Sequence, residues 1–153
     1  MPILVPLSQA LGTMRSASQL ALLLFTAPGF AAAACFEADY SVRTEYERAD
    51  AIVTGVVVSA QIQPNKEDSD PESFDGVYYK IQVTRSYRGP FRSTVTIYSD
   101  NSSGRFPMEI GSGYLLFLRS NHHYLSANNC GNSGLLIDSA KVVSSVEQLQ
   151  RSK

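Results

Sequence analysis

Two cysteines are the residues of this sequence best suited to chemistry. Cys35 and Cys130 are its only cysteines, and Cys35 follows directly on an alanine run at 31–34. Thiols of exported proteins usually pair as disulfides, whereas thiols in a reducing compartment stay free. The segment before Cys35 indicates export. The sequence therefore predicts a Cys35–Cys130 disulfide that closes a loop of almost the whole domain.

The first 34 residues have the features of a signal peptide. The apolar core at 20–25 is too short to span a bilayer, a Pro-Gly pair ends it, and small residues follow up to Ala34. The alternative is a buried N-terminal helix, but an alanine run beside Pro-Gly is more typical of a cleavage site. No positive charge precedes Met14, whereas Arg15 follows it directly, so Met14 is favoured as the start of translation. We therefore expect a secreted, periplasmic or cell-envelope protein with one domain at 35–153.

The charge of this domain argues against nucleic acid as a partner. After cleavage the chain keeps all 14 acidic residues and 12 of the 13 basic ones, which gives a formal charge of −2. Proteins that bind nucleic acid carry a basic patch or stripe that neutralises phosphates. The sequence contains no such cluster.

Most of the domain has the pattern of β-strands. Segments 51–58 and 113–118 are apolar on both faces, which is typical of strands covered on both sides. Segment 77–87 alternates apolar and polar residues, as a half-exposed strand does. Shorter strands are expected at 94–98 and 124–127.

Three further features concern the regularity of these strands and the loop between the first two. Gly55, inside the first strand, predicts a bulge or sharp bend. Arg85 is the one irregularity in the alternation of 77–87. The polar segment 61–76 is expected to be a hairpin loop.

Two short helices flank the strands. Val42, Tyr46 and Ala49 have helical spacing, and Ser41 can cap that helix. The same spacing recurs near the C-terminus, at Val142, Val146 and Leu149. Five strands with a glycine bend favour a small closed or partly open β-barrel. A β-sandwich is the competing architecture, but it needs about seven strands.

Five segments of the domain form a recognisable series. They are Cys35, Arg48-Ala49-Asp50-Ala51-Ile52-Val53-Thr54-Gly55-Val56-Val57, Tyr78-Tyr79-Lys80-Ile81-Gln82-Val83 with Ser86-Tyr87-Arg88-Gly89, Gly111-Ser112-Gly113-Tyr114-Leu115-Leu116-Phe117 and Leu125-Ser126-Ala127-Asn128-Asn129-Cys130-Gly131. Their order resembles bacterial proteins related to the tissue inhibitors of metalloproteinases, a netrin-like family. The match covers nearly all of 35–135 and implies a five-stranded OB-like barrel.

The resemblance implies a partner rather than a reaction. In inhibitors of this family the α-amine and carbonyl oxygen of the first cysteine chelate the catalytic zinc of a protease, and the adjacent residue enters its specificity pocket. Cys35 and Phe36 would carry these roles, with no cofactor and no metal of the protein's own. The expected partner is a zinc metalloprotease or another extracytoplasmic protein.

The sequence departs from the family at two places. Cys35-Phe36-Glu37 replaces the usual Cys-x-Cys, and Ser103-Gly104 stands where bacterial relatives often carry Cys-Gly. The loss of both cysteines fits the loss of one complete disulfide. Inhibitors place a small polar residue after the first cysteine, whereas Phe36 is bulky. A disulfide that only staples the barrel is therefore the main alternative to a protease-binding role.

Lipidation is a rival fate for Cys35. The alanines before it resemble a lipoprotein cleavage site, although that site usually has Leu or Val three residues before the cysteine. An acylated α-amine cannot chelate zinc. The second functional hypothesis is therefore an envelope-anchored lipoprotein of structural or ligand-binding type, which meets a membrane only through lipidated Cys35.

Other candidate sites have simpler explanations. His122 and His123 are adjacent, so on a strand they point to opposite faces and do not easily share one metal ion. We therefore expect both to be exposed turn residues. The acidic run at 67–75 lacks the central glycine and closing glutamate of an EF-hand, so a solvated loop is expected. Tyrosines at 78, 79, 87 and 98 are either a binding face or core and rim packing. Ser126 and Ser133 lack the Gly-x-Ser-x-Gly motif of a nucleophile, and we expect no enzyme activity.

Overall fold

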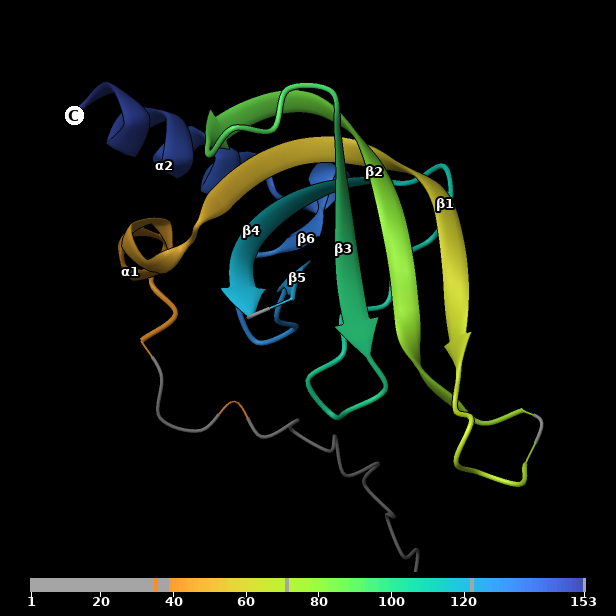
Figure 1. Ribbon diagram of the computed structural model, residues 1–153. Helices are drawn as coiled ribbons and strands as arrows, with labels where there is room; N and C mark the ends of the chain where they lie inside the picture. The colour runs from red at the N-terminus through yellow and green to blue at the C-terminus, as the bar shows by residue number, and fades with distance from the viewer. Residues whose placement is uncertain (1–34, 36–38, 71, 122, 153) are drawn as a thin grey trace, which may run out of the picture. The chain divides into compact units, whose positions relative to one another are not determined.

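The computed structural model describes Cys35 and residues 39–70, 72–121 and 123–152 (Figure 1). The predicted signal peptide at 1–34 and the candidate contact residue Phe36 lie outside the described residues. The elements in chain order are α1 (Val42–Arg48), β1 (Ala51–Pro64), β2 (Phe74–Arg88), β3 (Thr94–Asp100), β4 (Gly113–Asn121), β5 (Tyr124–Ser126), β6 (Gly134–Leu135), a 3-10 turn η1 (Leu136–Asp138) and α2 (Ala140–Arg151).

Five of the strands form a ring. The paired order is β1-β2-β3-β5-β4, and β4 also pairs with β1, so each of these strands has two neighbours within the ring. All pairs in the ring are antiparallel except β3–β5. The two-residue strand β6, which the sequence did not predict, adds to β4 outside the ring. The predicted mainly β class with two short helices is confirmed.

The first two strands are longer than predicted. The expectation of a loop over 61–76 was wrong, because β1 continues to Pro64 and β2 begins at Phe74, so the loop covers only 65–73. Within the extension, Gln61 pairs with Tyr78 and Ile62 with Val77. Backbone pairing does not require apolar side chains, and a strand that projects beyond the core can carry polar residues. Polarity alone therefore ended the first strand too early and started the second strand too late.

A bulge interrupts the β1–β2 pairing at Gly55, as the sequence predicted. Thr54 lies opposite Arg85 and Gly55 opposite Val83, which leaves one extra residue, Thr84, on β2. A Cβ atom on Gly55 would lie 2.5 Å from Ile81 Cγ2 and 2.6 Å from the carbonyl oxygen of Gln82. Glycine is required here because β1 and β2 approach too closely for a side chain.

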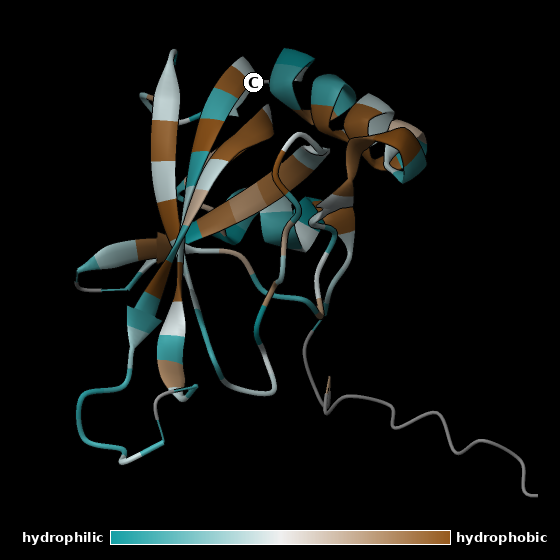
Figure 2. Ribbon diagram, turned by 90° about the vertical axis from the view of Figure 1, so that its right-hand side faces the viewer, coloured by the Kyte–Doolittle hydropathy of each residue, from teal (hydrophilic) through white to brown (hydrophobic). Residues whose placement is uncertain are grey.

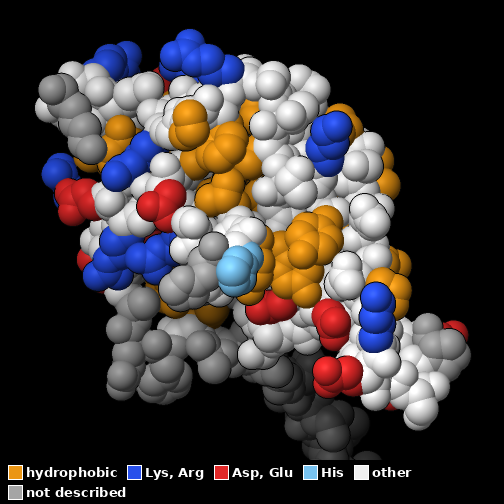
Figure 3. Space-filling model, in the orientation of Figure 1, with side chains coloured by type: hydrophobic (Ala, Val, Ile, Leu, Met, Phe, Trp, Pro, Cys, Tyr) orange, Lys and Arg blue, Asp and Glu red, His pale blue; other side chains and the backbone are white. Residues whose placement is uncertain are grey.

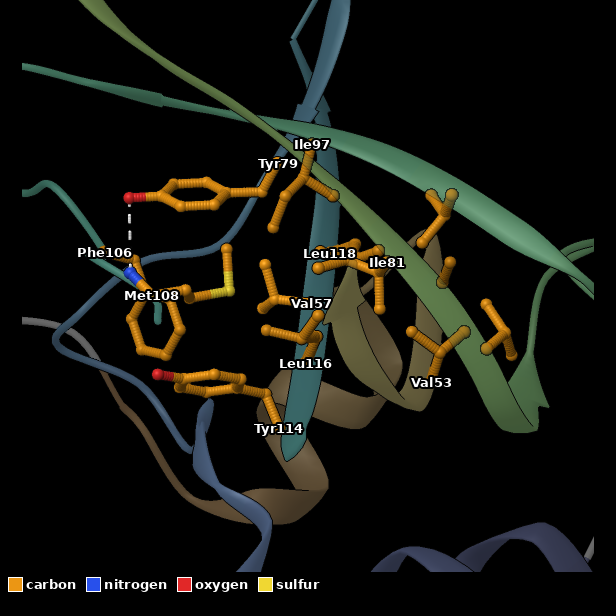
Figure 4. Close-up of a cluster of buried hydrophobic side chains, with 13 residues drawn as sticks. Val53, Val57, Tyr79, Ile81, Ile97, Phe106, Met108, Tyr114, Leu116 and Leu118 are labelled. Atoms are coloured by element: carbon orange, nitrogen blue, oxygen red, sulfur yellow. Dashed lines mark hydrogen bonds between the residues drawn. The ribbon is translucent and has the colours of Figure 1, made fainter. Parts of the chain in front are cut away.

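Two hydrophobic cores lie on opposite faces of β1 and β4. The ring encloses the first core, which includes Leu116 and Leu118, as Figure 4 shows. The second core lies under the helices and includes Leu115 and Phe117 of β4, with Val146 of α2. Successive residues of a strand point to opposite faces, and the hydrophobic bands along the strands are visible in Figure 2. Segment 113–118 is apolar on both faces because both faces are covered.

Helix α1 begins at a hydrogen-bonded cap. The Oγ atom of Ser41 accepts a hydrogen bond from Thr44 N at 3.3 Å, so the predicted N-cap is confirmed. Asp39 adds a second layer, because its carboxylate accepts from Ser41 N at 2.8 Å and from Thr44 Oγ1 at 2.6 Å. These contacts fix the direction in which the chain enters the helix.

Asp39 makes the stability of this end of the domain depend on pH. Hydrogen bonds from Thr44 and then from Ser41 hold the pKa of Asp39 below its ordinary value. The stabilisation is therefore fully present above the unfolded-state pKa of about 4, and it is lost as the pH falls through the lowered folded-state pKa. We expect Asp39→Asn to flatten the loss of stability between about pH 5 and pH 2, measured by urea unfolding. The control is Asp138→Asn, at an exposed aspartate of η1; equal pH dependence in both variants would contradict the assignment.

Candidate functional site

The predicted Cys35–Cys130 disulfide is present. The Cα atoms of the two cysteines are 5.5 Å apart, across a sequence separation of 95 residues. Cys35 is exposed, whereas Cys130 is half-buried in the loop between β5 and β6. The disulfide therefore holds the start of the described domain against a loop near its end.

Side-chain hydrogen bonds shape the loop that carries Cys130. Asn128 Oδ1 accepts from Cys130 N at 2.7 Å, which makes a tight turn. Asn129 Nδ2 donates to the carbonyl oxygen of Ser103 at 3.2 Å, in the loop that follows β3. Cys35 is thus bonded to one loop, which in turn is hydrogen-bonded to another.

Glu45 and Asn132 form a second attachment of the N-terminal segment. Glu45 Oε2 accepts from Asn132 N at 2.5 Å and from Asn132 Nδ2 at 2.6 Å. The same amide nitrogen lies 2.6 Å from the carbonyl oxygen of Tyr40, to which it also donates. Gly131 lies directly against the Glu45 carboxylate, where a Cβ atom would overlap it. The chain is therefore held covalently at Cys35 and by hydrogen bonds at 40–45.

A small cavity adjoins this attachment. Its volume is about 190 Å³, and Asp39, Tyr40, Arg48, Arg119 and Asn128 are among the residues that line it. Pockets for drug-sized ligands usually measure about 300–1,000 Å³. The cavity is smaller than that, and Asp39 and Tyr40 already take part in the contacts that hold the N-terminal segment.

Where the structure describes them, the remaining polar candidates do not come together as a reactive group. His123 lies exposed in the turn between β4 and β5, where its backbone N–H donates to the Asn121 carbonyl oxygen. His122 lies outside the described residues. Ser133 Oγ accepts a hydrogen bond from Phe117 N at 2.9 Å, which is a structural role. Among the residues described, no group of three or more His, Cys, Asp or Glu side chains is arranged to hold a metal ion.

The carboxylates of the acidic loop bind their own backbone. Asp68 Oδ1 accepts from Asp70 N at 3.0 Å, and Asp70 Oδ1 accepts from Glu72 N at 2.9 Å. These bonds are typical of turns, and the first of them is the main reason why the pKa of Asp68 lies below its ordinary value. The predicted solvated loop is confirmed at these residues, which are exposed.

The four tyrosines named from the sequence divide between two environments. Tyr79 and Tyr87 are buried, one in each core. Tyr78 and Tyr98 lie opposite each other on the outer face of β2 and β3, where Tyr124 joins them. Sequence reasoning missed Tyr124, Glu45 and Asn132, because their partners lie on strands or loops far away in the chain. The alternation within 77–87 was the available signal for the outward direction of Tyr78.

Comparison with known proteins leaves the family open. No family model matches the chain, and no curated protein matches it. In the described part of the chain no helix is long and apolar enough to cross a membrane. The resemblance to metalloproteinase inhibitors therefore stays a prediction.

Proposed function

We propose that this chain is an exported protein-interaction module that binds through the edge around Cys35. The observation that carries the proposal is the meeting of three segments at that edge. Cys35 is exposed and joined to the loop of Cys130, and that loop is hydrogen-bonded to Ser103 in the loop after β3. Loops held by a rigid scaffold are the usual carriers of binding function.

The edge is organised before any partner arrives. The disulfide fixes Cys35. Asn132 fixes the chain near α1, because it donates hydrogen bonds to the Tyr40 carbonyl oxygen and to the Glu45 carboxylate. A partner therefore does not have to order these segments, which lowers the entropic cost of association. This rigidity supports a binding role for a segment that contributes little to either core.

A metalloproteinase-inhibitor mechanism is the most specific form of the proposal. We infer that the ring of five strands is an OB-like barrel, as the resemblance implies. A catalytic zinc keeps an open coordination position, and an α-amine with a pKa near 8 loses its proton readily on binding. With Cys35 as the first residue of the mature protein, its amine and carbonyl oxygen reach the zinc, and Phe36 enters the adjacent pocket.

The envelope-anchored alternative conflicts with the disulfide. A lipid attached to Cys35 through a thioether uses the same sulfur that bonds to Cys130. The two states are mutually exclusive, so a lipoprotein would leave Cys130 as a thiol. Mass analysis of the mature N-terminus and thiol counting on the exported protein separate the two hypotheses. An unlipidated N-terminus at Cys35, or at Ala34, supports the interaction module.

An inserted alanine before Cys35 tests the inhibitor mechanism. The added residue displaces the chelating nitrogen by about 3–4 Å, against a zinc–nitrogen distance of about 2 Å. We expect the insertion to abolish inhibition of zinc endopeptidases while the unfolding temperature stays unchanged. One alanine added after the C-terminus is the control and should inhibit like the parent.

Phe36 provides a second test of the same mechanism. Phe36→Thr should improve inhibition of proteases with narrow pockets, because the smaller side chain fits them. Inhibition constants against a broad panel of zinc endopeptidases measure both effects. Failure of the unmodified protein to inhibit any of them at micromolar concentration would remove the inhibitor mechanism and leave the interaction module without it.

A further inference from the structure

Three tyrosines form a continuous row on the outer face of the ring. The row consists of Tyr78 on β2, Tyr98 on β3 and Tyr124 on β5. The ring centroids of Tyr78 and Tyr98 are 4.7 Å apart, and those of Tyr98 and Tyr124 are 4.8 Å apart. Figure 3 shows a hydrophobic patch over the lower parts of β2 and β3, beside the pale blue histidine and above acidic side chains. Tyr78 is 37% exposed, so the row presents an aromatic surface to solvent.

The strands hold this row in place. Tyr78 and Tyr98 are direct partners in the β2–β3 register. The Tyr98 ring lies over Gly76, where a Cβ atom would approach its Cζ and hydroxyl oxygen to 2.5 Å. At the other end, Asn121 Nδ2 donates to the Tyr124 hydroxyl at 3.3 Å. A glycine under one ring and a hydrogen bond to another indicate an aromatic surface that is formed before it binds anything.

A polar cleft continues the row at Tyr98 and Tyr124. Its volume is about 210 Å³, and its lining includes Asp100, Arg105 and Asn128. Hydrogen bonds within the cleft wall fix these groups: Ser102 Oγ donates to Asp100 Oδ1 at 2.6 Å, and Arg105 Nη1 donates to Asn101 Oδ1 at 3.1 Å. The row and the cleft together offer flat aromatic rings beside hydroxyl, amide, carboxylate and guanidinium groups.

The charges of this surface favour an uncharged ligand. The cleft carries one carboxylate, Asp100, and one guanidinium, Arg105, and the Asp75 carboxylate lies near Tyr98, so charges of both signs flank the row. Burial, followed by the nearby Asp75 carboxylate, raises the pKa of Tyr98, so its phenol is a neutral donor at physiological pH. A polyanion such as an oligonucleotide needs a basic surface, and a polycation needs an acidic one.

We propose that the tyrosine row and the adjoining cleft bind an uncharged oligosaccharide chain. The C–H face of a sugar ring is apolar and packs on a tyrosine ring, while its hydroxyl groups exchange hydrogen bonds with the polar groups of the cleft. The row runs across three strands, and its neighbouring rings are inclined to each other by 41° and 61°, so a sugar chain that bends along the row contacts more than one ring. This site does not include Cys35 and does not depend on the proposed binding of a protease.

The absence of tryptophan from the sequence permits a direct test. Tyr78→Trp places a single tryptophan in the row, and Ile137→Trp places one at an 85% exposed position on η1 as the control. The probes are cellohexaose, chitohexaose and maltohexaose. We expect at least one of them to shift the emission of Tyr78→Trp saturably, with a dissociation constant below about 1 mM, and to leave Ile137→Trp unchanged. No saturable shift with any of the three would overturn the proposal.

Calorimetry on otherwise unaltered protein separates ring stacking from folding. Tyr78→Ala and Tyr124→Ala should each weaken the oligosaccharide by about tenfold or more, while Tyr78→Phe keeps the affinity within about threefold because the ring remains. Circular dichroism checks that the variants keep the fold. Unchanged affinity in both alanine variants would refute the site.

Other classes of ligand provide a comparison. Tighter binding of a proline-rich peptide or of oligothymidylate than of every hexasaccharide would show that the occupant is of another class and would likewise overturn the proposal.

Discussion

The double substitution Cys35→Ser with Cys130→Ser should lower the free energy of unfolding by about 3 kcal/mol. The disulfide closes a loop with a sequence separation of 95 residues. In the chain-entropy model such a crosslink stabilises by about 4–5 kcal/mol, because it restricts the unfolded chain. The folded variant, however, regains freedom in the segment before α1, which offsets part of this amount. The expected fall in unfolding temperature is about 10–15 °C.

Thermal and urea unfolding of the natively oxidised protein and the double variant measure this effect. The reduced parent protein is the matched control, because it lacks the bond but keeps both sulfur atoms. It should unfold at nearly the same temperature as the double variant. A difference of less than about 1 kcal/mol between oxidised and reduced protein would contradict a stabilising role for the disulfide. The Glu45–Asn132 contacts would then hold the segment unaided.

Truncation of either of two adjacent leucines on β4 should cost the domain about 3 kcal/mol. Leu115 and Leu116 are both 0% exposed, yet they belong to different cores. Leu116 packs inside the strand ring, and Leu115 packs under α1 and α2. Replacing a buried leucine by alanine removes transfer free energy and leaves a cavity, at a cost of about 2–5 kcal/mol. We therefore expect Leu115→Ala and Leu116→Ala to be similarly destabilising.

Urea unfolding of both variants tests whether the helices complete a second core. Ile110→Ala is the control, because Ile110 is 63% exposed and its truncation should change stability by less than about 0.5 kcal/mol. A large effect of Leu116→Ala with almost none from Leu115→Ala would show that the helices merely lie against β4. Equal effects would show that the ring and the helix layer stabilise the same strand from both sides.

Local sequence patterns predicted most of the elements. Helical spacing at Val42, Tyr46 and Ala49 placed α1, and Ser41 predicted its cap. The doubly apolar pattern at 113–118 correctly indicated a strand covered on both faces. Gly55 predicted the bulge because no side chain fits between β1 and β2 at that point. These signals lie within a few residues of the feature that they predict.

The features that the sequence did not reveal depend on contacts between distant residues. The Glu45–Asn132 hydrogen bonds join positions 87 residues apart. Tyr124 joins the tyrosine row only because β5 pairs with β3, and the parallel register that aligns them is not encoded in either segment alone. Alternation within a strand gives the face of each residue but not the neighbouring strand. The candidate surfaces therefore needed the folded arrangement, whereas the disulfide followed from the count of cysteines.

The number and position of the cysteines limit the incorrect disulfides that this chain can form. Cys35 precedes the six strands of the described residues and Cys130 follows five of them, so the two sulfurs meet only when the first and last parts of the domain come together. With two cysteines in the sequence there is one possible intramolecular pairing, and no scrambled isomer exists that would have to be reshuffled. Oxidative folding of this chain requires an oxidant but no isomerase. Chains whose cysteines meet those of another chain before their own pair form a crosslinked oligomer instead.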